Sequence, residues 1–177
     1  MVSAGLVPGM ARSVKYRVQP RDLVNTLFPE APEFARKPAV LATGILVALC
    51  EWPAMNALRQ VMGDDEDSFG MGVSLSHQAP VLEGTVLTLS ARCVSVRGRV
   101  SRWDVSAHDG SRVVASGWAE FAVVRTAEFV ARHGVALTGG PAGRGGRLQP
   151  VQGQPVLKQV IRERTQEGRD LAVRAAG

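Results

Sequence analysis

The chain has 177 residues, 45% of them apolar, and its 21 Lys and Arg against 16 Asp and Glu give a net charge of +5. This length suits one soluble domain with an appendage, since domains commonly span roughly 100–200 residues. Residues 139–177 hold seven basic and three acidic residues, a net +4, whereas residues 1–138 are close to neutral. The charge distribution therefore argues against a basic folded body that binds nucleic acid.

Other classes of protein are disfavoured as well. The longest apolar run, around residues 40–50, is far shorter than the ~20 residues that span a bilayer. The N-terminus lacks the basic and apolar pattern of a secretory signal. Cys50 and Cys93 lie in apolar segments without CxxC spacing, which fits reduced thiols and supplies no zinc ligand set. We expect a cytoplasmic protein that has no metal or other cofactor and does not bind a membrane.

The first predicted elements are short. Ser13–Val18 alternates as a strand, with Tyr16 on its apolar face. A weak helical turn is predicted over residues 22–28, and three prolines mark residues 29–38 as a loop.

A long helix over Thr43–Met62 follows, with Gly63 as its C-cap and a kink at Pro53. Residues 45–50 are apolar on every side, which predicts that protein surrounds the first turns.

Four strands are predicted after this helix. In Ser68–His77, one face is apolar and the other small; the apolar face holds Phe69, Met71, Val73, Leu75 and His77. Thr85–Val96 is the second strand, and an Asp-Gly turn joins Arg102–Ala107 to Arg112–Val124 as a hairpin. This order predicts an α+β fold, an antiparallel sheet curled around the long helix.

The ends of the chain differ in composition from this body. We expect an N-terminal extension over residues 1–12 and a domain over 13–134, which closes with a helical turn at residues 127–133. Residues 135–155 are rich in Gly and Pro, as linkers are. Residues 156–177 form a basic tail of helical pattern.

Three polar side chains in or beside the apolar segments are candidates for chemistry. Glu51 follows the apolar half of the helix, so its carboxylate needs a structural partner or a function. His77 ends an apolar strand face, either as a structural histidine or as a general base. Thr43 opens the helix, either as its N-cap or as a hydroxyl beside free amides that can stabilise an oxyanion. Because about 12 Å of helix separates Thr43 from Glu51, the two cannot touch within one straight helix.

Three stretches that carry these residues resemble a known family. They are FPEAPEFARKPAVLATGILVALCEW (residues 28–52), SFGMGVSLSHQAP (68–80) and SAHDG (106–110). Over residues 13–131 the chain resembles hot-dog-fold thioesterases, most closely the fluoroacetyl-CoA thioesterase type. The resemblance implies that Thr43, Glu51 and His77 are catalytic and that Gly70 lies near the acyl group. It also implies a homodimer or larger homo-oligomer with acyl-CoA bound at the subunit interface, so that Thr43 and Glu51 of one site can belong to different protomers.

Two positions depart from the fluoroacetyl type. Lys37 stands where that type has an aromatic residue, with Phe34 nearby, and Phe121 stands where it has an arginine. We include these three among the expected substrate-binding residues, and the departures count against fluoroacetyl specificity. The leading hypothesis is an acyl-CoA thioesterase; the alternative is a non-catalytic hot-dog protein that binds an acyl-CoA or an acyl carrier. Nucleic-acid binding by the tail is disfavoured because no aromatic residue follows Phe129.

Overall fold

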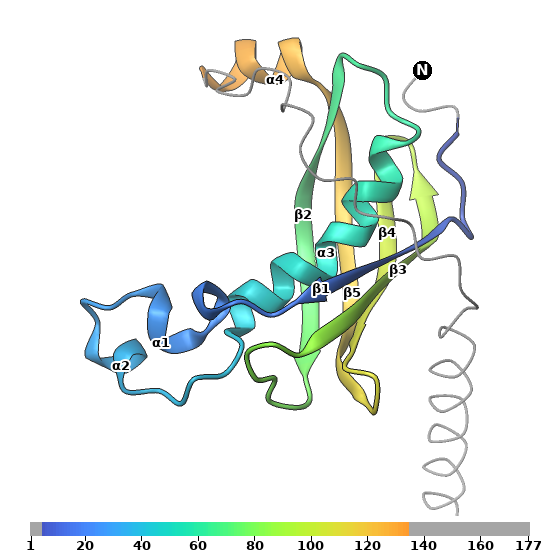
Figure 1. Cartoon of the computed structure of the whole chain (residues 1–177). Helices are drawn as coiled ribbons and strands as arrows, with labels where there is room; N and C mark the ends of the chain where they lie inside the picture. The colour runs from blue at the N-terminus through green and yellow to red at the C-terminus, as the bar shows by residue number, and fades with distance from the viewer. Residues whose placement is uncertain (1–4, 135–177) are drawn as a thin grey trace, which may run out of the picture.

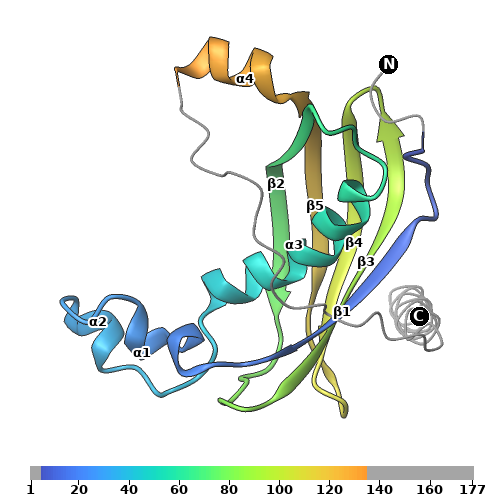
Figure 2. The ribbon, with the colours of Figure 1, turned by 45° about the horizontal axis from the view of Figure 1, so that its top comes forward.

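The structure is a computed structural model that describes residues 5–134 of the chain. A five-stranded antiparallel sheet in the order β1-β3-β4-β5-β2 holds a long helix, α3, against one face (Figures 1 and 2). This arrangement confirms the predicted α+β fold. The predicted linker over 135–155 and basic tail over 156–177 lie outside the described residues.

The strands are β1 (Ala11–Arg17), β2 (Glu66–His77), β3 (Val86–Arg97), β4 (Val100–His108) and β5 (Val113–Arg125). The helices are α1 (Val24–Leu27), α2 (Pro32–Ala35), α3 (Thr43–Arg59) and α4 (Thr126–His133), with a 3-10 turn at Pro20–Asp22. Helix α2 lies in the stretch that is predicted as a loop on the basis of its prolines. A proline at the first helical position is compatible with a helix, because the N–H that it lacks would have no partner within the helix. None of the described helices is long and apolar enough to cross a membrane.

Helix α3 ends before the predicted C-cap. Its last residue is Arg59, and the following Gln60 keeps right-handed helical angles, so the prediction of Gly63 as the cap is wrong. The Arg59 guanidinium instead donates a hydrogen bond to the carbonyl oxygen of Gly63 at 2.7 Å, and the Gly63 N–H donates to Glu66 Oε2 at 3.0 Å. These contacts hold the turn that carries the chain from α3 into β2.

The first turns of α3 have one buried and one exposed side. Leu46, Leu49 and Cys50 are buried against the sheet, whereas Thr43 and Gly44 are exposed. The prediction that protein surrounds these turns is therefore wrong for a single copy of the chain.

A β-bulge interrupts the alternation of β2. Gly70 pairs with Phe121 of β5 and Gly72 pairs with Glu120, so Met71 is an extra residue between them. A bulge places two residues of one strand opposite a single residue of the neighbouring strand. The residues before the bulge therefore lie on the sheet face opposite to the one that unbroken alternation predicts.

The reversal corrects the predicted faces of β2. Leu75 and His77 lie on the α3 side, as predicted, but Phe69 lies on the opposite face and stacks on Phe129 of α4 with ring centroids 4.3 Å apart. Gly70, predicted on the face away from the apolar residues, instead faces α3.

Candidate active site

The exposed end of α3 carries the first cluster of candidate residues. Ala42 is the N-cap and Thr43 the first helical residue, so the N-cap alternative for Thr43 is wrong. The Thr43 hydroxyl oxygen lies 3.0 Å from Nδ1 of His77, within hydrogen-bond distance. The backbone amides of the first helical turn have no partner within the helix, so a developing negative charge on a bound carbonyl oxygen would be stabilised here.

His77 is the last residue of β2 and is only partly exposed. Its Nε2 is buried and has no hydrogen-bond partner among the described residues. A neutral imidazole that accepts the Thr43 proton at Nδ1 carries its own proton on Nε2. A buried donor without a partner costs free energy, so the structure of one copy leaves His77 incompletely satisfied.

Asp22 holds the start of α3 through its backbone carbonyl oxygen, and its carboxylate is bound in turn by Tyr16. The N–H of Ala42 donates to the carbonyl oxygen of Asp22 at 2.9 Å, and the N–H of Leu41 donates to that of Val81 at 2.8 Å. The Asp22 side chain is 5% exposed and accepts a 2.6 Å hydrogen bond from the Tyr16 hydroxyl. Asp22 and Tyr16 are not among the candidates predicted from the sequence, although an Asp directly before the apolar Leu-Val pair is a signal of a buried polar contact.

Glu51 and Gly70 form the second cluster, two turns further along α3. The Glu51 carboxylate is partly buried, and desolvation raises its pKa above the ordinary value. A methyl group at Gly70 would lie 3.2 Å from Glu51 Oε1, so the glycine leaves room for the carboxylate. Phe121, opposite Gly70 on β5, is 1% exposed and packs in the core.

The remaining expected substrate-binding residues lie on α2 or just after it. Phe34 packs edge-on against Phe28 with ring centroids 4.9 Å apart, and Lys37 is exposed. Both views place α1 and α2 beside the end of α3 that carries Thr43 (Figures 1 and 2). One copy of the chain thus pairs Thr43 with His77, and Glu51 with Gly70, at two separate places.

Comparisons with known proteins identify the family. The model of the fluoroacetyl-CoA-specific thioesterase family matches residues 18–127. A fluoroacetyl-CoA thioesterase from Streptantibioticus cattleyicolor is 40% identical over 115 residues, which are 65% of this chain and 83% of that protein.

Solved structures agree with this match. One of a fluoroacetyl-CoA thioesterase is 38% identical, covers 72% of this chain and 95% of its own, and has a TM-score of 0.69. A thioesterase superfamily member from Thermus thermophilus is 20% identical, covers 73% of this chain and 91% of its own, and with a TM-score of 0.65 shows the same fold. The chain therefore belongs to the fluoroacetyl-CoA-specific thioesterase family and has its hot-dog fold.

Proposed function

We propose that this protein hydrolyses small acyl-CoA thioesters at a site that two copies of the chain build together. The observation that carries the proposal is the hydrogen bond between Thr43 and His77 on the exposed end of α3, a hydroxyl paired with a base. Family membership supplies the reaction class, since the relatives are named as thioesterases.

The free edge of β2 supports assembly into a homodimer. Among the described strands, β2 pairs only with β5, and its 12 residues leave a long unpaired edge. Met71 and Val73 on this strand are 63% and 41% exposed. A long edge with exposed apolar side chains is a surface on which a second strand can pair. We infer that β2 of a second copy covers it.

The bulge in β2 favours one register for this pairing. In this register the two-fold axis passes at Ser74, so Gly72 lies opposite the partner's Ser76. Because Met71 is the extra residue of the bulge, the next residue to pair is Gly70, and it lies opposite the partner's His77. Paired residues share a sheet face, and Gly70 and His77 both lie on the α3 side because of the bulge. This register brings Glu51 and Gly70 of one protomer to Thr43 and His77 of the other, two identical sites per dimer.

In the proposed reaction, His77 accepts the proton of the Thr43 hydroxyl while Thr43 Oγ1 attacks the thioester carbonyl carbon. The tetrahedral oxyanion lies at the amides of the first turn of α3. The carbon–sulfur bond breaks, and His77 returns the proton to the departing CoA thiolate. The Glu51 carboxylate of the other protomer then takes a proton from the water that attacks the acyl-threonine ester. As the bond between the acyl carbon and Thr43 Oγ1 breaks, this proton passes to Oγ1, which restores the Thr43 hydroxyl and releases the free acid.

Mixing of two inactive variants tests the composite site. A dimer of one His77→Ala and one Glu51→Gln chain contains one intact site and one doubly mutated site. Refolding an equal mixture should therefore restore about one quarter of wild-type thiol release, because half of the dimers are mixed. Each variant refolded by itself is the control. No recovery in the mixture, with mixed dimers present, would overturn the composite site.

Intact mass and peptide mapping test the role of each residue in the reaction. Glu51→Gln should accumulate an acyl group on Thr43 when mixed with acetyl-CoA. An acyl group on Glu51 of the wild-type chain would make the carboxylate the nucleophile. Thr43→Ala with unchanged turnover would mean that water attacks the thioester directly, with Thr43 as a hydrogen-bond donor.

A panel of acyl-CoA substrates tests the reaction class and the acyl preference. We expect thiol release from acetyl-, propionyl- and fluoroacetyl-CoA with no marked preference for the fluorinated group, because Lys37 and Phe121 replace the residues of the fluoroacetyl type. Binding of acyl-CoA by calorimetry without thiol release from any of them would support a non-catalytic binding protein instead.

A further inference from the structure

Helix α4 projects past the outer strand of the sheet. It begins where β5 ends, and in both views its last turn extends beyond β2 (Figures 1 and 2). None of its eight residues is buried in one copy of the chain. An isolated helix of this length is marginal in water, since about 12–15 residues are needed for stability. Helix α4 therefore needs a surface to pack against, and its own sheet supplies only part of one.

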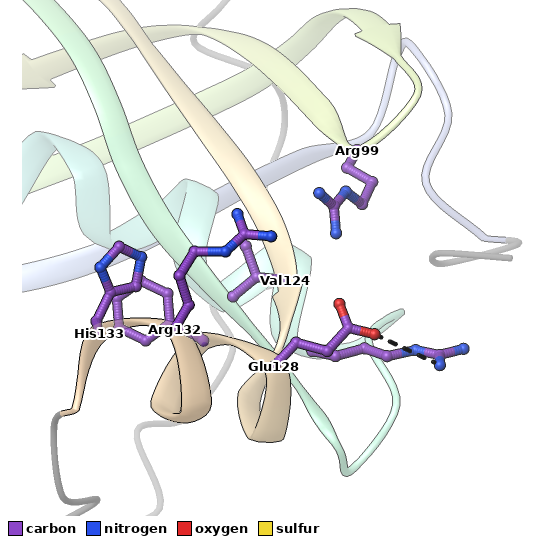
Figure 3. A pocket seen from close by; sticks show the side chains of 7 residues that line it. Arg99, Val124, Glu128, Arg132 and His133 are labelled. Atoms are coloured by element: carbon purple, nitrogen blue, oxygen red, sulfur yellow. Dashed lines mark ion pairs between the residues drawn. The ribbon is translucent and has the colours of Figure 1, made fainter.

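The side of α4 that faces β2 carries two rings in succession. The ring of Phe129 stacks on that of Phe69, with centroids 4.3 Å apart, so this residue is held by its own chain. His133, one turn further out, is exposed, and its ring lies 4.6 Å from that of Phe129. Figure 3 shows Arg132 turned back above Val124 of its own sheet, whereas His133 lies at the outer end of the helix. His133 thus extends the row of rings beyond the edge of β2.

The dimer register of the proposed function places one residue of the partner beside this row. In that register, Gly70 lies opposite the partner's His77. The next pair along the strands is therefore Phe69 with the partner's Gln78. The pairing of β2 with β5 continues this far, because the Gln78 N–H donates to the carbonyl oxygen of Val114 at 2.8 Å. Gln78 alternates with His77 and so lies, like Phe69, on the face away from α3.

The spacing along α4 matches the spacing between strands. Four residues of helix advance about 6 Å, and neighbouring strands lie about 4.8 Å apart. When Phe129 covers its own β2, His133 therefore lies over the partner's Gln78. The hydrogen-bonding groups also fit. The Gln78 amide nitrogen donates to Ser116 Oγ at 2.7 Å, and its amide oxygen accepts no hydrogen bond in the described part of the chain. An imidazole N–H is a donor for such an oxygen.

We propose that α4 clasps the dimer across the paired β2 strands, with an imidazole N–H of His133 donating a hydrogen bond to the amide oxygen of the partner's Gln78. The inference rests on the dimer of the proposed function. Each dimer has two such clasps, one at each end of the paired strands. They brace, from the face away from α3, the pairing of Gly70 with the partner's His77, where the two clusters of the site meet.

Chemical cross-linking tests the clasp. A chain that carries both His133→Cys and Gln78→Cys should give a covalent dimer with a short bismaleimide, because each new thiol meets its counterpart on the partner. Within one copy, Gln78 lies eight paired positions along β2 from Phe69, which α4 covers, or about 27 Å. A dimer-sized band on a denaturing gel therefore reports contact between chains.

The matched control combines His133→Cys with Lys15→Cys. Lys15 is exposed on the same face of the sheet, but on β1, four strands from β2 and so about 19 Å away from Gln78. This pair should not be linked, and neither should His133→Cys or Gln78→Cys alone.

The outcomes separate the clasp from the dimer itself. Ser74→Cys, at the two-fold axis, should be linked by the same reagent. If Ser74→Cys is linked and the His133→Cys/Gln78→Cys chain is not, the clasp is overturned while the dimer stands, and α4 is left to another occupant, such as residues 135–177 of the same chain. If neither is linked, the dimer of the proposed function fails and the clasp fails with it.

Sedimentation in moderate urea tests the hydrogen bond. His133→Ala and Gln78→Ala should each raise the concentration at which half of the dimers dissociate about fivefold, the effect of one hydrogen bond. The double variant should dissociate no more readily than either single variant, because both substitutions remove the same bond. Lys15→Ala is the control and should behave as wild type. Effects of the two substitutions that multiply, or no effect of either, would overturn the contact.

Discussion

Among single residues, Glu51 has surroundings that oppose its charge. Its carboxylate is partly desolvated on a helix whose buried side is apolar, and no hydrogen bond to it occurs among the described residues. Burial of the neighbouring Cys50 thiol, together with the adjacent Glu51 charge, raises the pKa of Cys50 to about 12. A carboxylate kept in such a position at the expense of stability is what a general base requires.

The raised pKa of Glu51 predicts a gain in stability when its charge is removed. A carboxyl with a higher pKa in the folded protein binds more protons folded than unfolded between its two pKa values. Its contribution to stability therefore falls as the pH rises from 4.5 through the raised value. Glu51→Gln should raise Tm at pH 7 but not at pH 4 in thermal melts, while steady-state thiol release is lost. Glu83→Gln, an exposed carboxylate, should change neither; an equal shift at both pH values would contradict the argument.

The space that Gly70 leaves for the Glu51 carboxylate is predicted to be necessary for full activity. Gly70→Ala puts a methyl group 3.2 Å from Glu51 Oε1, so the carboxylate has to move by a few tenths of an ångström. We expect kcat to fall about tenfold, since small misplacements of a reacting group are costly. Gly72→Ala is the control, because its methyl group would meet Trp118 at 3.4 Å and Glu120 at 3.9 Å on the other face, both at ordinary contact distance. Equal kcat for the two variants would separate Gly70 from the site.

At the scale of elements, the pairing of β2 with β5 determines where both clusters lie. Gly117 of β5 lies so close to β2 that a methyl group on it would overlap the backbone carbonyl of Ser74. This close approach lies between the bulge at Met71 and His77, so it fixes the segment of β2 that joins the two clusters.

Gly117→Ala should therefore damage the fold itself. The overlap is with backbone, which cannot rotate away, so we expect a loss of about 3 kcal/mol or more in the free energy of unfolding. Urea unfolding followed by circular dichroism measures this loss. The Gly72→Ala protein is again the reference, and a Gly117→Ala protein of wild-type stability would show that the strands can separate locally.

The elements that follow simple periodicity were predictable, and those that break it were not. The alternation of apolar and polar residues predicted the strands, and the apolar run over residues 45–50 predicted α3. The bulge was missed because Gly70 and Gly72 have no side chain to reveal which face they occupy, and the run of alternating residues continues across it. The glycine on each side of Met71 was the available signal, since glycine in a strand often marks a bulge.

At the scale of the whole molecule, one chain places the Thr43–His77 pair and the Glu51–Gly70 pair at two separate places. The sequence indicated Thr43, Glu51 and His77 as candidates, and helix geometry indicated that the first two are too far apart to meet. The pairing of Asp22 with Tyr16 could not be found from sequence, because it joins segments whose packing depends on the finished sheet.

A cysteine scan of β2 tests the proposed dimer register. With the axis at Ser74, Ser74→Cys places two thiols directly opposite each other, within the Cα separation of about 7 Å that a disulfide tolerates. Ser76→Cys, on the same strand and face, places them about 13 Å apart. Mild oxidation and non-reducing gels should give a cross-linked dimer for the first variant only. The native thiols of Cys50 and Cys93 are buried and should not interfere, and cross-linking at Ser76 in preference to Ser74 would contradict the register.

Tyr16 connects β1, the edge strand opposite β2, to the surroundings of both Thr43 and Glu51. Its ring lies edge-on to Trp52, the neighbour of Glu51, with centroids 6.1 Å apart. Its hydroxyl holds the Asp22 side chain, and the Asp22 carbonyl in turn holds the residue before Thr43. Burial and the adjacent Asp22 raise the Tyr16 pKa, so the phenol keeps its proton into alkaline solution. A residue of β1 thus contacts the neighbours of both Thr43 and Glu51, so a substitution at Tyr16 changes the support of both positions at once.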